Sequence, residues 1–388
     1  MVELFWFLLP VAALGGWYAA RRGREGADGI SRVFPDPEYL KGLDYLLNEK
    51  PDKAIDVFVR MLEVSDDTFE THLILGNLFR KRGEVDRAIR VHHNLVERDS
   101  LSAEQRCDAL LELGRDYQRA GLLDRAEALY SELLQCRGHV EEVLPHLLDI
   151  YQQEKDWDRA ISTASRMGQV NNRPAAIIIA HFLCELAVEA AEAGDTEKAR
   201  RLLGQALDTH RSCARASMLL GDMEHDAGHH AAALLAYSRV DGQDTELLPE
   251  VLESMYACQR ELGHTDRMIE YLRECIPRDN GNAPVILLTD ILVEQHRQEE
   301  ACELITRQLA RSPSLRSLAK YLDLRLAGCR TNEQETLVVL KKFAERLQKG
   351  RPAYLCGECG FAGKTLHWQC PGCKCWDTVR PLHDAELV

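Results

Sequence analysis

A small residue recurs through most of this 388-residue chain at intervals close to 34 residues. Each copy stands in an apolar context, and the copies are Ala54, Ala88, Ala126, Ala160, Ala199 and Ala233, with Met268 and Ala301 as weaker members. The successive intervals are 34, 38, 34, 39, 34, 35 and 33 residues. A nearly fixed period of this length indicates a stack of short structural units, each too small to bury its apolar face alone.

A second small position comes about twelve residues before the first. It is glycine in four copies (Gly42, Gly76, Gly114 and Gly221) and Leu148, Ala187, Tyr256 or Thr289 in the others. Two antiparallel helices that approach closely need small side chains at such a pair, and turn signals such as Arg82-Gly83-Glu84 lie between the two positions. The pattern predicts an all-α tetratricopeptide-repeat solenoid of about eight units over residues 38–313, with an extended concave surface for binding proteins.

The two long intervals predict longer helices or loops around residues 98–106 and 168–173. Two further helices, over 315–326 and 333–348, lack the small pair. We expect them to form a helical cap over residues 314–350, which joins the repeats to the C-terminal segment.

Two CxxC motifs dominate the C-terminal segment, residues 351–388. They are Cys356-Gly-Glu-Cys359 and Cys370-Pro-Gly-Cys373. Two such turns facing each other form a tetrahedral four-sulfur cage for one iron or zinc ion, so all four cysteines are predicted metal ligands. Three glycines fit these turns because they tolerate positive φ and let backbone N–H groups approach sulfur; they are Gly357, Gly360 and Gly372.

Alternatives at this site are a disulfide pair, a redox dithiol, or Cys375 as a substitute ligand. We expect His367 to lie on the ribbon surface or beside the ligands. Trp368 and Trp376 are interpreted as a roof over the small ribbon core rather than as platforms for nucleic-acid bases.

Residues 4–20 form an apolar run at the short limit for a membrane-spanning helix, and Arg21, Arg22 and Arg24 follow it. A basic cluster after the apolar run favours a retained anchor over a cleaved signal peptide and places the rest of the chain in the cytoplasm. The sequence therefore predicts a single-pass transmembrane anchor over residues 1–20 and a short tether over residues 21–37.

Composition excludes several classes of function. The formal charge of −14 repels nucleic acid, and the C-terminal segment has four basic and four acidic residues, so it offers no basic face. Eight cysteines scattered singly, such as Cys258, read as small buried side chains of a reducing compartment. The sequence contains no catalytic motif, so we predict no catalytic residues.

Two pairs of adjacent histidines are His92-His93 and His229-His230. Because adjacent side chains on a helix point in different directions, we interpret both pairs as solvated positions rather than metal sites.

In order and length, the combination of anchor, repeats and CGECGF/CPGC knuckles resembles the lipopolysaccharide assembly protein B family of Gram-negative bacteria. That resemblance implies a non-enzymatic regulator at the bacterial inner membrane, with a rubredoxin-like domain packed on the repeats. Its implied partners are a membrane AAA+ protease, the lipid A pathway deacetylase that the protease degrades, and other lipopolysaccharide assembly proteins; a homodimer is compatible with it. Two alternatives stay open: a membrane-tethered electron-transfer protein with iron in the ribbon, and a pure scaffold for biosynthetic enzymes.

Overall fold

The computed structural model describes residues 37–48, 50, 53–55, 57–58, 69–135, 139–171, 175–278, 281–328 and 334–382. The predicted anchor over residues 1–20 lies outside these ranges, as does the tether except for Pro37. Within the described ranges, no helix is both long and apolar enough to cross a membrane. The anchor therefore stays a prediction.

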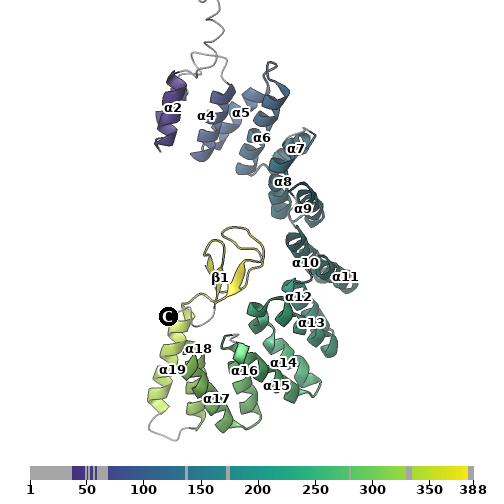
Figure 1. Ribbon diagram of the computed structural model, residues 1–388, viewed down its shortest axis with the longest axis vertical. Helices are drawn as coiled ribbons and strands as arrows, with labels where there is room; N and C mark the ends of the chain where they lie inside the picture. The colour runs from purple at the N-terminus through teal and green to yellow at the C-terminus, as the bar shows by residue number, and fades with distance from the viewer. Residues whose placement is uncertain are drawn as a thin grey trace, which may run out of the picture. The chain divides into compact units, whose positions relative to one another are not determined.

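The chain divides into two compact units, residues 1–150 and 151–388. Helices of the first unit are α2 (Pro37–Leu47), α4 (Phe69–Lys81), α5 (Val85–Val96), α6 (Ala103–Arg119), α7 (Leu123–Leu133) and most of α8 (Val140–Glu154). Repeat helices of the second unit are α9 (Trp157–Asn171), α10 (Ala176–Glu192), α11 (Thr196–Thr209), α12 (Ala214–Asp226), α13 (His230–Gln243), α14 (Leu252–Glu261), α15 (Thr265–Cys275), α16 (Ala283–Glu294) and α17 (Gln298–Arg311) (Figure 1).

Consecutive helices pack as antiparallel pairs, for example α4 with α5, α10 with α11 and α12 with α13. The recurring alanine position of every copy is buried, from Ala54 and Ala88 at 0% exposed to Met268 at 1%. The predicted repeat solenoid is thus confirmed for the described residues.

Each of the four glycines that precede the recurring alanine lies under a ring from the second helix of its own repeat. The four rings belong to Phe58, His92, Tyr130 and Tyr237. A Cβ added at Gly221 would lie 2.4 Å from the Tyr237 ring, and one at Gly114 would lie 2.5 Å from the Tyr130 ring. The ring comes four residues after the recurring alanine. In copies without the glycine, that position holds Ala164, Leu203, Leu272 or Ile305. The glycine therefore makes room for a ring.

The two long intervals are taken up by longer helices, as expected. Helices α6 and α10 have 17 residues each, whereas the equivalent helices α4 and α12 have 13. The repeat register continues on both sides of the extra turn.

The C-terminal part of the second unit begins with α18 (Leu315–Gly328) and α19 (Gln334–Lys349), where the sequence predicts two helices. A small antiparallel sheet follows, in the order β2-β1-β3, from strands β1 (Tyr354–Cys356), β2 (Ala362–Gly363) and β3 (Val379–Pro381). Together with its loops it forms the ribbon, residues 354–381, which lies on the inner side of the curved row of helices of its own unit (Figure 1). Two 3₁₀ helices, η2 (Thr245–Glu250) and η3 (Ile276–Arg278), complete this unit.

Candidate metal centre

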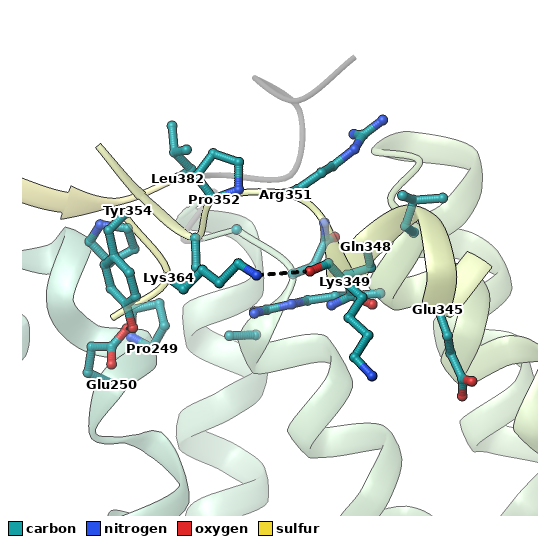
Figure 2. A pocket seen from close by; sticks show the side chains of 17 residues that line it. Pro249, Glu250, Glu345, Gln348, Lys349, Arg351, Pro352, Tyr354, Lys364 and Leu382 are labelled. Carbon is teal, nitrogen blue, oxygen red and sulfur yellow. Dashed lines mark hydrogen bonds between the residues drawn. The ribbon is translucent and has the colours of Figure 1, made fainter. Parts of the chain in front are cut away.

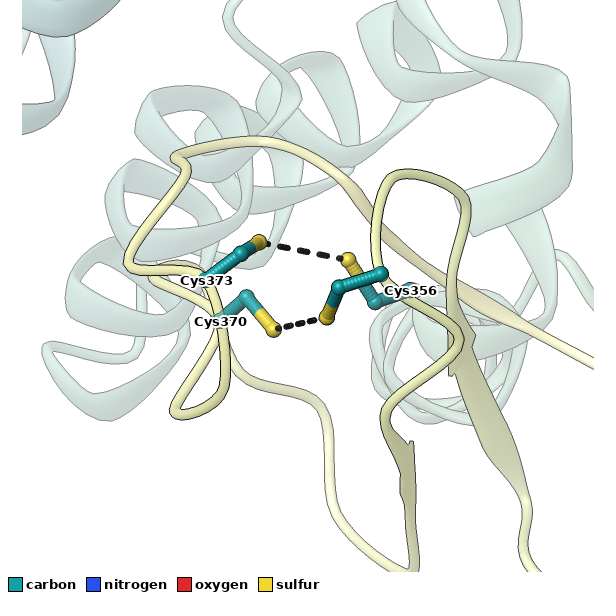
Figure 3. A group of neighbouring side chains, drawn as sticks. Cys356, Cys370 and Cys373 are labelled. Atoms are coloured by element: carbon teal, nitrogen blue, oxygen red, sulfur yellow. Dashed lines mark hydrogen bonds between the residues drawn. The ribbon is translucent and has the colours of Figure 1, made fainter. Parts of the chain in front are cut away.

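The four predicted ligands converge between two loops of the ribbon. Cys356 ends β1 and Cys359 lies in the turn after it. Cys370 and Cys373 occupy the opposite loop (Figure 3). The Sγ atoms of Cys356 and Cys373 are 3.8 Å apart, those of Cys359 and Cys370 are 3.6 Å apart, and all four lie within 4.8 Å of one another. A tetrahedron with metal–sulfur bonds of about 2.3 Å has edges of about 3.8 Å, so the cage fits one zinc or iron ion.

The three glycines of the knuckles turn out to have different roles. Gly360 has φ +73° and supplies the left-handed residue of the first turn. Gly372 leaves room, because a Cβ there would lie 3.2 Å from the Cys359 Sγ atom. Gly357 shows neither need. In the second turn the left-handed residue is Lys374, at φ 59°, so the expectation of positive φ holds for one glycine of the three.

Hydrogen-bond donors surround the sulfur atoms. The Thr378 hydroxyl, 3.3 Å from the Cys356 Sγ atom, is the main cause that lowers the pKa of that thiol to about 6. Backbone N–H groups of Phe361 and Cys375 donate to Cys359 and Cys373 respectively and lower the pKa of each thiol, although burial and the neighbouring thiols leave both pKa values above the ordinary value. Donors of this kind favour the thiolate form that a metal requires.

Cys375 and His367 lie outside the cage. The Cys375 side chain is exposed and its Sγ atom contacts the Cys373 carbonyl oxygen at 3.7 Å, away from the four-sulfur cluster. His367 is partly exposed and contacts Phe361 and the Thr365 hydroxyl.

The two tryptophans do not roof the ribbon core, so that interpretation is wrong. The ribbon core consists of Cys356, Cys370 and Val379 with partly buried neighbours, and neither tryptophan belongs to it. Trp376 stacks on His181 of α10 with ring centroids 5.2 Å apart, and its edge meets Trp157 and Phe182. Trp368 packs against the core of the repeat helices instead. Their apolar rings therefore dock the ribbon on the repeat helices.

Polar contacts complete this docking. The Gln152 Oε1 atom accepts hydrogen bonds from the Trp376 indole at 2.8 Å and from the Gln369 amide at 3.1 Å. Arg380 reaches Asp244 at 2.9 Å, next to η2. The Tyr354 hydroxyl donates to Glu250 at 2.9 Å.

His181 lies at the centre of the docking face. It is 2% exposed, and burial, followed by the nearby Arg215 charge, lowers its pKa to about 3. The imidazole is therefore neutral near pH 7, and its 3.9 Å approach to Asp377 is not an ion pair there.

A cavity of about 440 Å³ lies at the base of the ribbon, between α19, η2 and the segment from Arg351 to Tyr354 (Figure 2). Its lining mixes acidic Glu250 and Glu345 with basic Lys349 and Lys364. Within the lining, the Lys364 ammonium donates to the Lys349 carbonyl oxygen at 3.4 Å (Figure 2). This mixed lining carries no cluster of catalytic groups.

Three contacts were not evident from the sequence. Gln152 and His181 stand on repeat helices without any motif around them, and their role comes only from what packs on them. His92, read as solvated, is 0% exposed, lies over Gly76, and its Nδ1 atom is 2.5 Å from Asp116. Gly76, sixteen residues before His92, was the available signal, since a glycine there leaves room for a buried ring at the position of His92.

Comparisons with family models and with curated relatives agree with this architecture. Residues 354–381 match the family model of the rubredoxin metal binding domain, and residues 71–104 and 184–246 match tetratricopeptide-repeat models. Lipopolysaccharide assembly protein B of Escherichia coli (strain K12) is 39% identical over 100% of both chains, and that of Haemophilus influenzae is 32% identical over 100% of both. The solved structure of Naa15/Naa10 bound to HypK-THB aligns with a TM-score of 0.42 at 15% identity, over 81% of this chain and 47% of that one.

Proposed function

Because the chain belongs to the lipopolysaccharide assembly protein B family, we propose that it acts in lipopolysaccharide assembly as a non-catalytic adaptor. The stacked helical hairpins support a protein-binding role, since such arrays expose extended surfaces to partners. The fit of the ribbon to a structural metal site agrees with an adaptor, and no catalytic constellation stands among the described residues.

The finer proposal is that the adaptor restrains lipopolysaccharide output. It brings the lipid A pathway deacetylase to a membrane AAA+ protease at the cytoplasmic face of the inner membrane, where residues 1–20 anchor it. Tethering both partners to one array makes the encounter effectively intramolecular, which raises its rate without any new chemistry.

In this proposal Cys356, Cys359, Cys370 and Cys373 hold one iron or zinc ion. The bound ion supplies a fixed tetrahedral cross-link between the two loops. A segment as small as the ribbon cannot bury enough apolar surface to fold alone, so the cross-link stabilises it. The folded ribbon then presents Trp376 and Arg380 to the repeat helices. That docked aromatic face is the observation that carries a structural role for the metal.

A second candidate is electron transfer through an iron-loaded ribbon. The observation that favours it is the exposed Cys359, which would bring one edge of the cage to solvent. Zinc-loaded protein separates the two ideas, because zinc has no redox chemistry. Full regulatory activity of the zinc form would agree with the adaptor role and exclude the electron-transfer role.

The experiment that tests the main proposal is a chase of the deacetylase after translation is stopped, in cells depleted of this protein. We expect a clearly longer half-life than in undepleted cells. Complementation with the wild-type chain should restore the short half-life, and a Cys370→Ser chain should not. An unchanged half-life on depletion would contradict the adaptor proposal and favour a scaffold that only gathers biosynthetic enzymes.

A further inference from the structure

Three side chains that commonly bind transition metals meet on the repeat helices, outside the ribbon cage. They are His225 near the end of α12, His230 at the start of α13, and Cys258 on α14. One ligand atom from each lies within 4.8 Å of the others. The Cys258 Sγ atom is 3.4 Å from the His225 Nδ1 atom, and the two histidine rings are 5.3 Å apart between centroids.

The helical hairpin explains why these residues meet. The turn at 227–229 reverses the chain between His225 and His230, so two histidines five residues apart face each other across the hairpin. Cys258 comes from the next repeat, whose first helix α14 packs on this hairpin. Figure 1 shows the three helices α12, α13 and α14 following one another along the row.

The other repeats show what stands at the positions equivalent to His225, His230 and Cys258. Equivalent positions in α4 and α6 hold Arg80 and Asp116, whose side chains form an ion pair at 2.7 Å. Equivalent positions in α9 and α10 hold Trp157 and Glu189, joined by a hydrogen bond of 2.8 Å. The fold therefore brings these positions together in different units, and only the α12–α14 copy places two histidines and a cysteine in them.

The polar atoms of the cluster are incompletely satisfied. Cys258 is 0% exposed, and the His230 Nδ1 atom is buried without a hydrogen-bond partner among the described residues. Leaving a buried ring nitrogen unpaired is costly, whereas coordination of a cation would satisfy it. Both histidines are only partly buried, so an ion can reach the cluster from solvent.

We propose that His225, His230 and Cys258 bind one divalent transition-metal ion of the zinc class, with water as the fourth ligand. Two imidazole nitrogens and one thiolate form a donor set that zinc accepts in tetrahedral geometry with an open position. Bonds of about 2.0 Å to nitrogen and about 2.3 Å to sulfur put these atoms about 3.5 Å apart in a tetrahedron, close to the 3.4 Å between Cys258 and His225. The bound ion fastens the α12–α13 hairpin to α14.

The test counts metal ions on the full-length chain in detergent. Protein reduced with a non-thiol phosphine is equilibrated with zinc, passed through a desalting column, and analysed by mass spectrometry of the metal. We expect about two ions per wild-type chain, one in the ribbon and one here. Cys258→Ala and His230→Gln should each retain about one. Cys275→Ala is the matched control, because Cys275 is equally buried but belongs to no possible metal-binding group within the part of the chain that the structure describes.

Cobalt supplies an independent readout. Replacing zinc by cobalt should give a thiolate-to-cobalt absorption that titrates in two steps, and Cys258→Ala should remove one step while the ribbon step stays. His230→Gln decides the matter if Cys258→Ala fails to fold, because the His230 side chain is partly exposed. About one ion per wild-type chain, or an unchanged wild-type count in His230→Gln, would overturn the proposal.

Discussion

At the scale of single residues, Trp376 links the metal cage to the repeats. Its ring stacks on His181 and its indole N–H donates to Gln152, which lies 224 positions earlier in the chain. Because Trp376 follows Cys373 by three positions, the fold of the second knuckle fixes where the indole points. Metal binding and docking are therefore coupled through one short loop.

Serine substitutions should distinguish the four metal ligands from the nearby Cys375. Cys370→Ser removes a buried ligand, so we expect loss of the ribbon ion and unfolding of residues 354–381. The matched control Cys375→Ser changes an exposed sulfur outside the cage and should keep the ion. Metal content and tryptophan fluorescence of both variants measure this. Retention of the ion by Cys370→Ser, or its loss in Cys375→Ser, would contradict the assignment.

The depressed pKa of His181 predicts acid sensitivity of the docking. Folded His181 has a pKa of about 3, against about 6.5 when unfolded, so only the unfolded chain takes up the proton as pH falls between these values. The free energy of unfolding then falls by at most about 1.4 kcal/mol per pH unit below about 6.5. Denaturant unfolding at several pH values, followed by tryptophan fluorescence, measures this slope.

His181→Phe is the comparison for that titration. It keeps a ring against Trp376 and removes the proton-binding site, so its stability should change less between pH 7 and pH 5.5 than that of the wild type. Loss of metal in acid affects both proteins equally. Identical slopes would exclude His181 as the acid-sensitive group.

The cage could be predicted from the sequence because its ligands come as two local pairs, and the spacing of each pair fixes its geometry. Docking contacts could not, since Gln152 and His181 carry no local pattern. The same limit applies to His225, His230 and Cys258. In the sequence His230 stands out only as the neighbour of His229. In the structure the hairpin turns its ring toward His225.

At the scale of elements, the glycine-and-ring pairs set how closely two helices pack. Gly221→Ala should destabilise the second unit by roughly 1–3 kcal/mol, because the added Cβ overlaps the Tyr237 ring, which the hydroxyl contact with Asp222 holds in place. Gly204→Ala in α11 is the matched control, since open space surrounds it. That change should stabilise the protein by about 0.5–1 kcal/mol through helix propensity. Thermal unfolding should therefore shift in opposite directions, and a shared direction would refute the packing argument.

The helical pairs were predictable because a period of about 34 residues reports on both helices and their turn at once. The reason for the glycines was predicted only in part. Close approach was expected between backbones, but in the structure the space belongs to a ring four residues after the recurring alanine. A rule based on helix spacing alone does not reveal which side chain fills it.

At the scale of the whole molecule, the ribbon should act as a removable brace on its own unit. Chelation of the ribbon ion should raise amide hydrogen exchange in α10 and near η2, where Trp376 and Arg380 dock. Helix α17, which has no partner from the ribbon in those contacts, serves as the internal reference. Hydrogen exchange with mass spectrometry measures both. Equal exchange in α10 before and after chelation would show that the ribbon does not brace the repeats.

The 224 positions between Gln152 and Trp376 also matter while the chain is being made. A ribosome adding about 5–20 residues per second needs on the order of 10–45 seconds to travel from one to the other. Once α9 and α10 have been made, Phe182 and Trp157 stand on finished helices without their cover for the rest of that interval. The nascent chain thus shows an aromatic patch that the mature protein hides, and chaperones or early partners have that window in which to use it.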